Sequence, residues 1–274
     1  MSDVVALGKA GVAIRKANDA GRGALIGYLP AGFPTYDGAV DGVKAMIDGG
    51  ADVIELGLPY SDPVMDGVTI QRATEVALAG GLRTRDVLST VEKVAAYSDV
   101  PVLVMTYWNP IERYGVDRFA ADFAAAGGAG LITPDLTPDE GAEWIAAADK
   151  HELDKVFLVS PSSTDARISM TTANCRGFVY ATAVMGVTGA REQTSDLAAP
   201  LVARTKAVTG IPVGVGLGVS NGDQAAGVAA YADAVIVGSA FVKALDEGGP
   251  AGVRELTASL AEGVRREPRT FVVR

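Results

Sequence analysis

Eight short apolar runs alternate with longer stretches of helical pattern, and this alternation constrains the fold more than any other feature of the sequence. Each run is rich in Val, Ile, Leu or aromatic residues and is short enough for a strand that is buried on both faces. Several intervening stretches begin at Thr, Ser or Asp and end at Gly, as capped helices do. The runs are ALIGYLP (24–30), DVIELGLP (52–59), PVLVMTYW (101–108), GLITPDLT (130–137), KVFLVSP (155–161), GFVYATA (177–183), PVGVGLGV (212–219) and DAVIVGSA (233–240).

Strands that alternate with helices form right-handed βαβ units and a parallel sheet. Eight such units predict an α/β fold of the closed (β/α)8 TIM-barrel type, and residues 2–20 predict an additional N-terminal helix. An open, doubly wound sheet is the alternative, although about five or six strands are more usual there. No linker or low-complexity segment divides the chain, so we expect residues 1–274 to form a single catalytic domain. At 137–140, TPDE also predicts a capping box at the start of a helix.

Composition argues against several classes of protein. The 274 residues carry a net charge of −9 and show no basic face, which argues against a nucleic-acid partner. No signal peptide or apolar run long enough for a membrane span is visible, so we expect a cytoplasmic protein. With one cysteine, Cys175, and one histidine, His151, the chain offers neither a metal cluster nor a His-based catalytic triad. Any acid–base chemistry must therefore come from carboxylates, Tyr or Lys.

Glu55 is an unusual residue to find in the middle of an apolar strand. Side chains alternate along a strand, so Val53, Glu55 and Gly57 share the face that points into the barrel. A structural role is open to Glu55, as a buried carboxyl satisfied by hydrogen bonds or by a Lys partner. A desolvated carboxyl also has the raised pKa that general acid–base catalysis needs, and we interpret Glu55 as a catalytic residue.

Asp66 is a second candidate, in the loop that follows the same strand. Loops after the strands carry the active site of a (β/α)8 barrel. Asp-Gly before a helix is also a common turn or cap, and the same holds for Asp62 in SDP. The residue pattern leaves both readings of Asp66 open.

Two Gly-rich segments follow the seventh and eighth predicted strands. GVGLGVSNGDQAA (214–226) and VGSAFVKAL (237–245) each run from a strand end into a helix, where backbone N–H groups converge on an anion. Phosphate sites in these two loops recur among barrels, although tight packing of the strands also favours glycine. The polar loop MGVTGAREQTSD (185–196) is typical of a lid or of an ordinary surface loop.

Tyr28, Tyr180 and the segment TYWN (106–109) place aromatic residues in or at the ends of strands, where they line an apolar pocket or belong to the core. The pattern so far indicates a barrel that binds a phosphate ester beside a flat apolar group. Schiff-base chemistry would need a lysine at the carboxyl end of a strand, but Lys155 lies at the start of the fifth strand.

The motifs ELGLPYSDPVMDG, TYWNP, GVTG, GVGLGVS and VGSAFV, in that order, resemble the tryptophan synthase alpha chain family over nearly the whole chain. The resemblance implies a lyase that cleaves indole-3-glycerol phosphate to indole and glyceraldehyde 3-phosphate without a cofactor of its own. It implies that Glu55 is the acid–base residue and that Asp66 stabilises the indole N–H. The other implied site residues are Tyr28, Tyr107, Tyr180 and Thr188 for substrate, and Gly189, Gly218, Gly238 and Ser239 for phosphate.

The resemblance also implies a partner. The family works with a β subunit that carries pyridoxal phosphate, in an α2β2 complex, and Pro59, Asp62 and Asn109 match the contact surface. Tyr60 departs from a frequent Phe, and Val184 stands where some members have Arg. Two other functions stay open at this point: another phosphate-binding barrel lyase or isomerase, and a non-catalytic regulatory partner of a β subunit.

Overall fold

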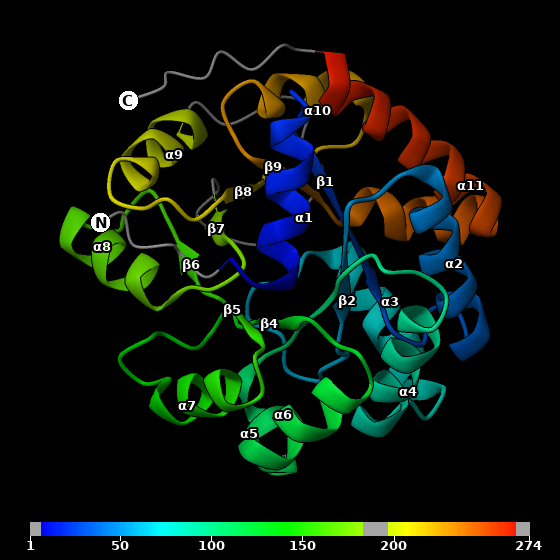
Figure 1. Ribbon diagram of the computed structural model, residues 1–274. Coiled ribbons are helices and arrows are strands. Elements are labelled where there is room, and N and C mark those ends of the chain that lie inside the picture. The colour runs from blue at the N-terminus through cyan, green and yellow to red at the C-terminus, as the bar shows by residue number, and fades with distance from the viewer. Residues whose placement is uncertain (1–6, 183–196, 267–274) are drawn as a thin grey trace.

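A computed structural model describes residues 7–182 and 197–266 and contains one parallel sheet ringed by helices (Figure 1). Its strands follow the order β5-β4-β3-β2-β1-β9-β8-β7-β6. They are β1 (Ala24–Pro30), β2 (Val53–Gly57), β3 (Val102–Met105), β4 (Gly130–Ile132), β5 (Asp154–Val156), β6 (Leu158–Val159), β7 (Val179–Thr182), β8 (Val213–Gly216) and β9 (Ala234–Val237).

The fifth predicted strand is split in two, and the split closes the barrel. β5 pairs with β4 and β6 pairs with β7, while Phe157 separates the two halves. The Phe157 carbonyl still accepts a 3.1 Å hydrogen bond from the backbone N–H of Tyr180. The chain from 154 to 159 is therefore a single staggered barrel strand. The predicted eight-stranded (β/α)8 fold, with an extra N-terminal helix, is confirmed.

Helices follow the strands and cover the outside of the barrel. α2 shows the expected end signals: Thr35 Oγ1 accepts a hydrogen bond from the N–H of Gly38, and Gly50 ends the helix with φ of 105°. The helices are α1 (Gly8–Asp19), α2 (Tyr36–Gly49), α3 (Val68–Ala79), α4 (Thr84–Ala95), α5 (Trp108–Tyr114), α6 (Val116–Ala125), α7 (Ala142–Lys150), α8 (Asp165–Asn174), α9 (Ala198–Lys206), α10 (Gly222–Ala229) and α11 (Ser239–Arg266), which is kinked at Gly249.

The TPDE segment does not begin a helix, so that sequence prediction was wrong. Residues 137–140 form a turn in which the N–H of Glu140 bonds to the Thr137 carbonyl at 3.0 Å. The helix α7 starts only at Ala142, with Gly141 as its N-cap. Glycine at 141 interrupts the helical run that the capping box needs.

Two apolar cores lie on the two faces of the sheet. Ile54, Leu56 and Leu58 pack toward the helices, whereas Val53 packs inside the barrel. The alternation of β2 thus agrees with the sequence, and it places Glu55 on the inner face with Val53. The inner core also contains Ile26, Leu103, Ile132, Val156, Phe178, Ala234 and Ile236.

The helix α1 closes the barrel at the amino ends of the strands (Figure 1). Its Ala10, Ile14 and Ala17 are fully buried against the inner core. Asp154, at the start of β5, accepts a 2.8 Å hydrogen bond from the backbone N–H of Ala10. Burial raises the pKa of Asp154 to about 6, although Ala10 and Arg176 act in the opposite direction. Helix α1 therefore covers the barrel interior at the amino ends of the strands.

Of the helices in the described ranges, none is both long and apolar enough to cross a membrane.

Candidate active site

Glu55 lies in the middle of β2, level with Tyr28 on β1 and Leu103 on β3. Its side chain is 1% exposed, and within the described ranges its Oε2 has no hydrogen-bond partner. Burial raises the pKa of Glu55 to about 8, and the nearby charge of Asp66 adds to this effect. At neutral pH the group therefore holds a proton that it can donate.

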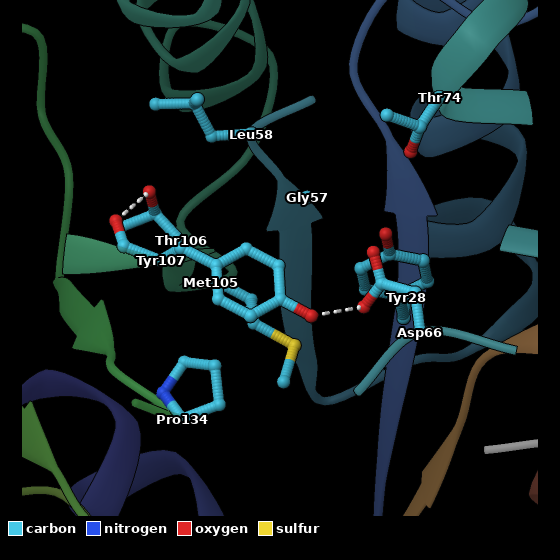
Figure 2. Close-up of a pocket in the computed structure, with 9 residues that line it drawn as sticks. All are labelled: Tyr28, Gly57, Leu58, Asp66, Thr74, Met105, Thr106, Tyr107 and Pro134. Atoms are coloured by element: carbon cyan, nitrogen blue, oxygen red, sulfur yellow. Dashed lines mark hydrogen bonds between the residues drawn. The ribbon is translucent and has the colours of Figure 1, made fainter. Parts of the chain in front are cut away.

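Asp66 lies in the loop 58–67 that connects β2 to α3, and its carboxyl faces Tyr107 (Figure 2). The Tyr107 hydroxyl donates a 3.0 Å hydrogen bond to Asp66 Oδ1 and accepts one, also 3.0 Å, from the backbone N–H of Met65. Burial raises the pKa of Asp66, whereas the hydrogen bond from Tyr107 lowers it. Tyr107 thus fixes the position of this carboxyl and favours its ionised form.

A pocket opens between Asp66 and the carboxyl ends of β1, β2 and β3 (Figure 2). Gly57 is required at its wall, because a Cβ there would lie 2.3 Å from the Tyr28 hydroxyl oxygen. The lining is partly aromatic and partly polar, and the cavity it encloses measures about 20 Å³. The lining residues are Tyr28, Gly57, Leu58, Asp66, Thr74, Met105, Thr106, Tyr107 and Pro134.

Tyr180 approaches the same centre from the opposite side of the barrel. It lies on β7, level with Gly214 on β8, and the charge of Glu55 contributes, after burial, to raising its pKa well above the usual value. Gly216 leaves room for it, since a Cβ there would lie 2.6 Å from the Tyr180 hydroxyl oxygen. Tyr28 is likewise buried with a raised pKa, so both hydroxyls stay protonated and can act as donors.

The predicted phosphate positions lie after the last two strands. Gly218 follows β8 with φ of +70°, a conformation that favours glycine. Gly238 and Ser239 follow β9, and Ser239 is the first residue of α11, where backbone N–H groups lack partners within the helix. Thr188 and Gly189, together with Val184 and the loop 185–196, lie outside the described residues.

Ser239 also lines a groove that the sequence analysis had not anticipated. Ser220, Arg72 and Lys243 line the same groove, so two cationic side chains lie on this side of the barrel. Lys243 is 3.8 Å from Glu247, an exposed pair one helical turn away on α11. Exposed pairs of this kind contribute little to stability.

The predicted partner residues lie at the rim beside Asp66. Asp62 and Asn109 are exposed, whereas Pro59 is buried. Asp62 accepts a 2.6 Å hydrogen bond from the Ser61 hydroxyl, and Asn109 donates one of 3.2 Å to the Tyr60 hydroxyl.

Two contacts at this site were missed from the sequence. The side chain of Gln71 donates a 2.7 Å hydrogen bond to the backbone carbonyl of Asp66, and Tyr60 packs against Tyr107 with ring centroids 5.5 Å apart. Gln71 lies in the first turn of α3, so its side chain can reach the Asp66 carbonyl only because the helix begins at Val68. The sequence showed Tyr60 only as a departure from the family pattern.

Lys155, which the sequence analysis set aside as a Schiff-base residue, lies far from Glu55 and Asp66 in the barrel. Lys155 lies at the amino end of the barrel, where it forms an ion pair with Asp149. Across residues 7–182 and 197–266, no three His, Cys, Asp or Glu side chains are grouped so that they could hold a metal ion.

Comparison with known proteins agrees with this architecture. Residues 14–267 match the family model described as "Tryptophan synthase alpha chain". A relative of that name from Acidothermus cellulolyticus is 59% identical, over 95% of this chain and 98% of its own length. One from Salinispora arenicola is 60% identical, over 93% and 97%. A solved structure of Mycobacterium tuberculosis tryptophan synthase superposes with a TM-score of 0.90 at 55% identity, over 95% of this chain and 99% of the other. This chain therefore belongs to the tryptophan synthase alpha chain family.

Proposed function

We propose that this chain, as a single catalytic domain, cleaves indole-3-glycerol phosphate to indole and glyceraldehyde 3-phosphate in tryptophan biosynthesis. Membership of the family supports the reaction. The arrangement of Glu55 supports the assignment of the chemistry, because it is a buried carboxyl with a raised pKa, close to a second carboxyl that is held by a tyrosine.

Glu55 performs both proton transfers in this proposal. Its carboxyl first donates a proton to C3 of the indole ring, which leaves a positive charge on the ring nitrogen. The resulting carboxylate then removes the proton from the glycerol hydroxyl next to the ring. The carbon–carbon bond breaks, its electron pair returns to the ring, and an aldehyde forms. Protons balance, and the ring itself accepts the electrons, so neither a lysine nor a metal ion is needed.

Asp66 stabilises the charge that develops during this reaction. Its carboxylate accepts a hydrogen bond from the indole N–H, and the interaction strengthens as the ring becomes positive. Tyr107 holds the carboxylate in place, at 3.0 Å. The rings of Tyr28, Tyr107 and Tyr180 form walls for the substrate, while Gly218, Gly238 and Ser239, with Gly189 from the loop outside the described residues, bind the phosphate through backbone N–H groups.

The partner belongs to the same proposal. A β subunit docks on the rim that carries Pro59, Asp62 and Asn109, within an α2β2 complex, and pyridoxal phosphate is bound by that subunit. The exposure of Asp62 and Asn109 beside the loop of Asp66 supports this placement.

Replacement of the proposed acid–base group tests the reaction. Glu55→Gln keeps the size of the side chain and removes the transferable proton, so turnover should fall on the order of 10²–10⁴-fold. Binding of substrate should persist, because the phosphate positions are unchanged. Glu75→Gln, on the exposed face of α3, is the matched control. Indole release by Glu55→Gln at the rate of the control would refute the assignment, and the absence of indole release by the wild-type chain would refute the proposed activity.

A further inference from the structure

The loop 58–67 is attached at two points to the three residues 107–109. Near its start, the Tyr60 hydroxyl accepts a 3.2 Å hydrogen bond from the side-chain amide of Asn109. Near its end, Tyr107 contacts both the N–H of Met65 and the carboxyl of Asp66, at 3.0 Å each. Tyr107 is the N-cap of α5, and Asn109 is the second residue of that helix. Both ends of the loop are therefore hydrogen-bonded to the start of α5.

The two attachment points also touch each other. The rings of Tyr60 and Tyr107 lie 5.5 Å apart at an interplanar angle of 39°, in contact but tilted. Tyr60 is half-buried, so its ring is packed while its hydroxyl reaches the exposed amide of Asn109. A shift of Tyr60 would therefore move the face against which the Tyr107 ring rests. Tyr107 is the group that orients Asp66.

We infer that Tyr60 is a positioning residue for Asp66, acting through the Asn109 hydrogen bond and the ring of Tyr107. The inference rests on the proposed function, in which Asp66 must face the indole N–H. The hydroxyl of Tyr60 makes a hydrogen bond that a phenylalanine could not make, so the chain holds Asp66 partly in place before a partner subunit binds.

Tyr60→Phe tests this role, because it removes this hydrogen bond and keeps the ring. In the isolated full-length chain, kcat for indole release should fall about 10-fold while KM changes less than about 2-fold, since a misaligned catalytic group affects the chemical step. Tyr97→Phe is the matched control: it removes a 2.7 Å hydrogen bond to Asp48 on the outer, helical layer. Asn109→Ala removes the donor of the same hydrogen bond and should give a similar loss of kcat.

Two further readouts separate positioning from general destabilisation. The losses of Tyr60→Phe and Asn109→Ala should not add in the double variant, because both remove one contact. Carbon-13 NMR should show a higher pKa for the Asp66 carboxyl in Tyr60→Phe, because the Tyr107 hydrogen bond that lowers this pKa is weakened. The NMR titration needs no turnover, so it reports on positioning even if the proposed reaction is wrong. An Asp66 pKa and a kcat equal to those of Tyr97→Phe, or fully additive losses, would overturn the inference.

Discussion

The carboxyls of Glu55 and Asp66 interact directly through their charges, so that Asp66 reinforces the effect of burial in raising the pKa of Glu55 to about 8. One acid is fixed on a strand inside the barrel and the other lies on a loop at its mouth. Burial raises the pKa of both carboxyls, but Asp66 also accepts a hydrogen bond from Tyr107 that opposes this effect. With a pKa of about 8 Glu55 keeps its proton at neutral pH, whereas the Tyr107 hydrogen bond to Asp66 favours the ionised form of that carboxyl.

This difference predicts the pH dependence of the reaction. In the proposed reaction protonated Glu55 is the proton donor, so kcat/KM for indole release should fall as the pH rises through about 8. In Asp66→Asn the neighbouring charge is gone, so the pKa of Glu55 should be lower, which carbon-13 NMR of the carboxyl measures. Asp62→Asn, on the exposed part of the same loop, is the control and should leave that pKa unchanged. A Glu55 pKa near 4.5 in the wild-type chain would contradict the interpretation.

The same pKa predicts how folding stability depends on pH. The pKa of Glu55 is higher in the folded chain, so the folded state binds a proton that the unfolded state releases between about pH 4.5 and 8. The contribution of Glu55 to stability is therefore fully present below the unfolded pKa and is lost as the pH rises toward 8.

Glu55→Gln removes this contribution, so it should become more stable relative to wild type as the pH rises. The difference in free energy of unfolding should grow by about 4 kcal/mol between pH 4 and pH 8, at about 1.4 kcal/mol per pKa unit. Urea denaturation at several pH values measures it. Asp154 has a raised pKa of the same sign, but it is present in both proteins and cancels in the difference. A difference that does not change with pH would show that Glu55 is not protonated in the folded chain.

The fold and the inward position of Glu55 could be predicted from sequence because both depend on local pattern. The strands of this barrel are buried on two faces, so each is a visible apolar run, and alternation alone turns Glu55 inward. The contacts around Asp66 depend instead on the path of two loops. Nothing in the sequence places Tyr60 against Tyr107, or Gln71 under the Asp66 carbonyl. The hydrogen bond from the Ala10 N–H to Asp154, which anchors α1, could not be predicted either, because the two residues are 144 positions apart in the sequence.

The phosphate positions give a further prediction. Gly218→Val should weaken the binding of both substrate and inorganic phosphate, because the side chain fills the loop and φ of +70° disfavours valine. Gly21→Val is the matched control: Gly21 has φ of +78° and open space around it, between α1 and β1. Isothermal titration with inorganic phosphate compares the two. Equal affinities in the two variants would place the phosphate elsewhere.

The last prediction concerns the partner and the loop of Asp66. Glu55 is held by the barrel, whereas Asp66 lies on a loop with Pro59, Pro63 and the exposed Asp62. If both carboxyls must be aligned for turnover, a β subunit docked on this loop should hold Asp66 more firmly and raise the rate of indole release. A displacement of about 1 Å can cost on the order of 10²-fold in rate, so the activation should be large. Indole release is compared for the isolated chain and for the complex.

Asp62→Ala should reduce the activation by the partner while leaving the rate of the isolated chain unchanged, since Asp62 contacts Ser61 and not the pocket. A wild-type rate that is the same with and without the β subunit would show that this loop does not link partner binding to catalysis.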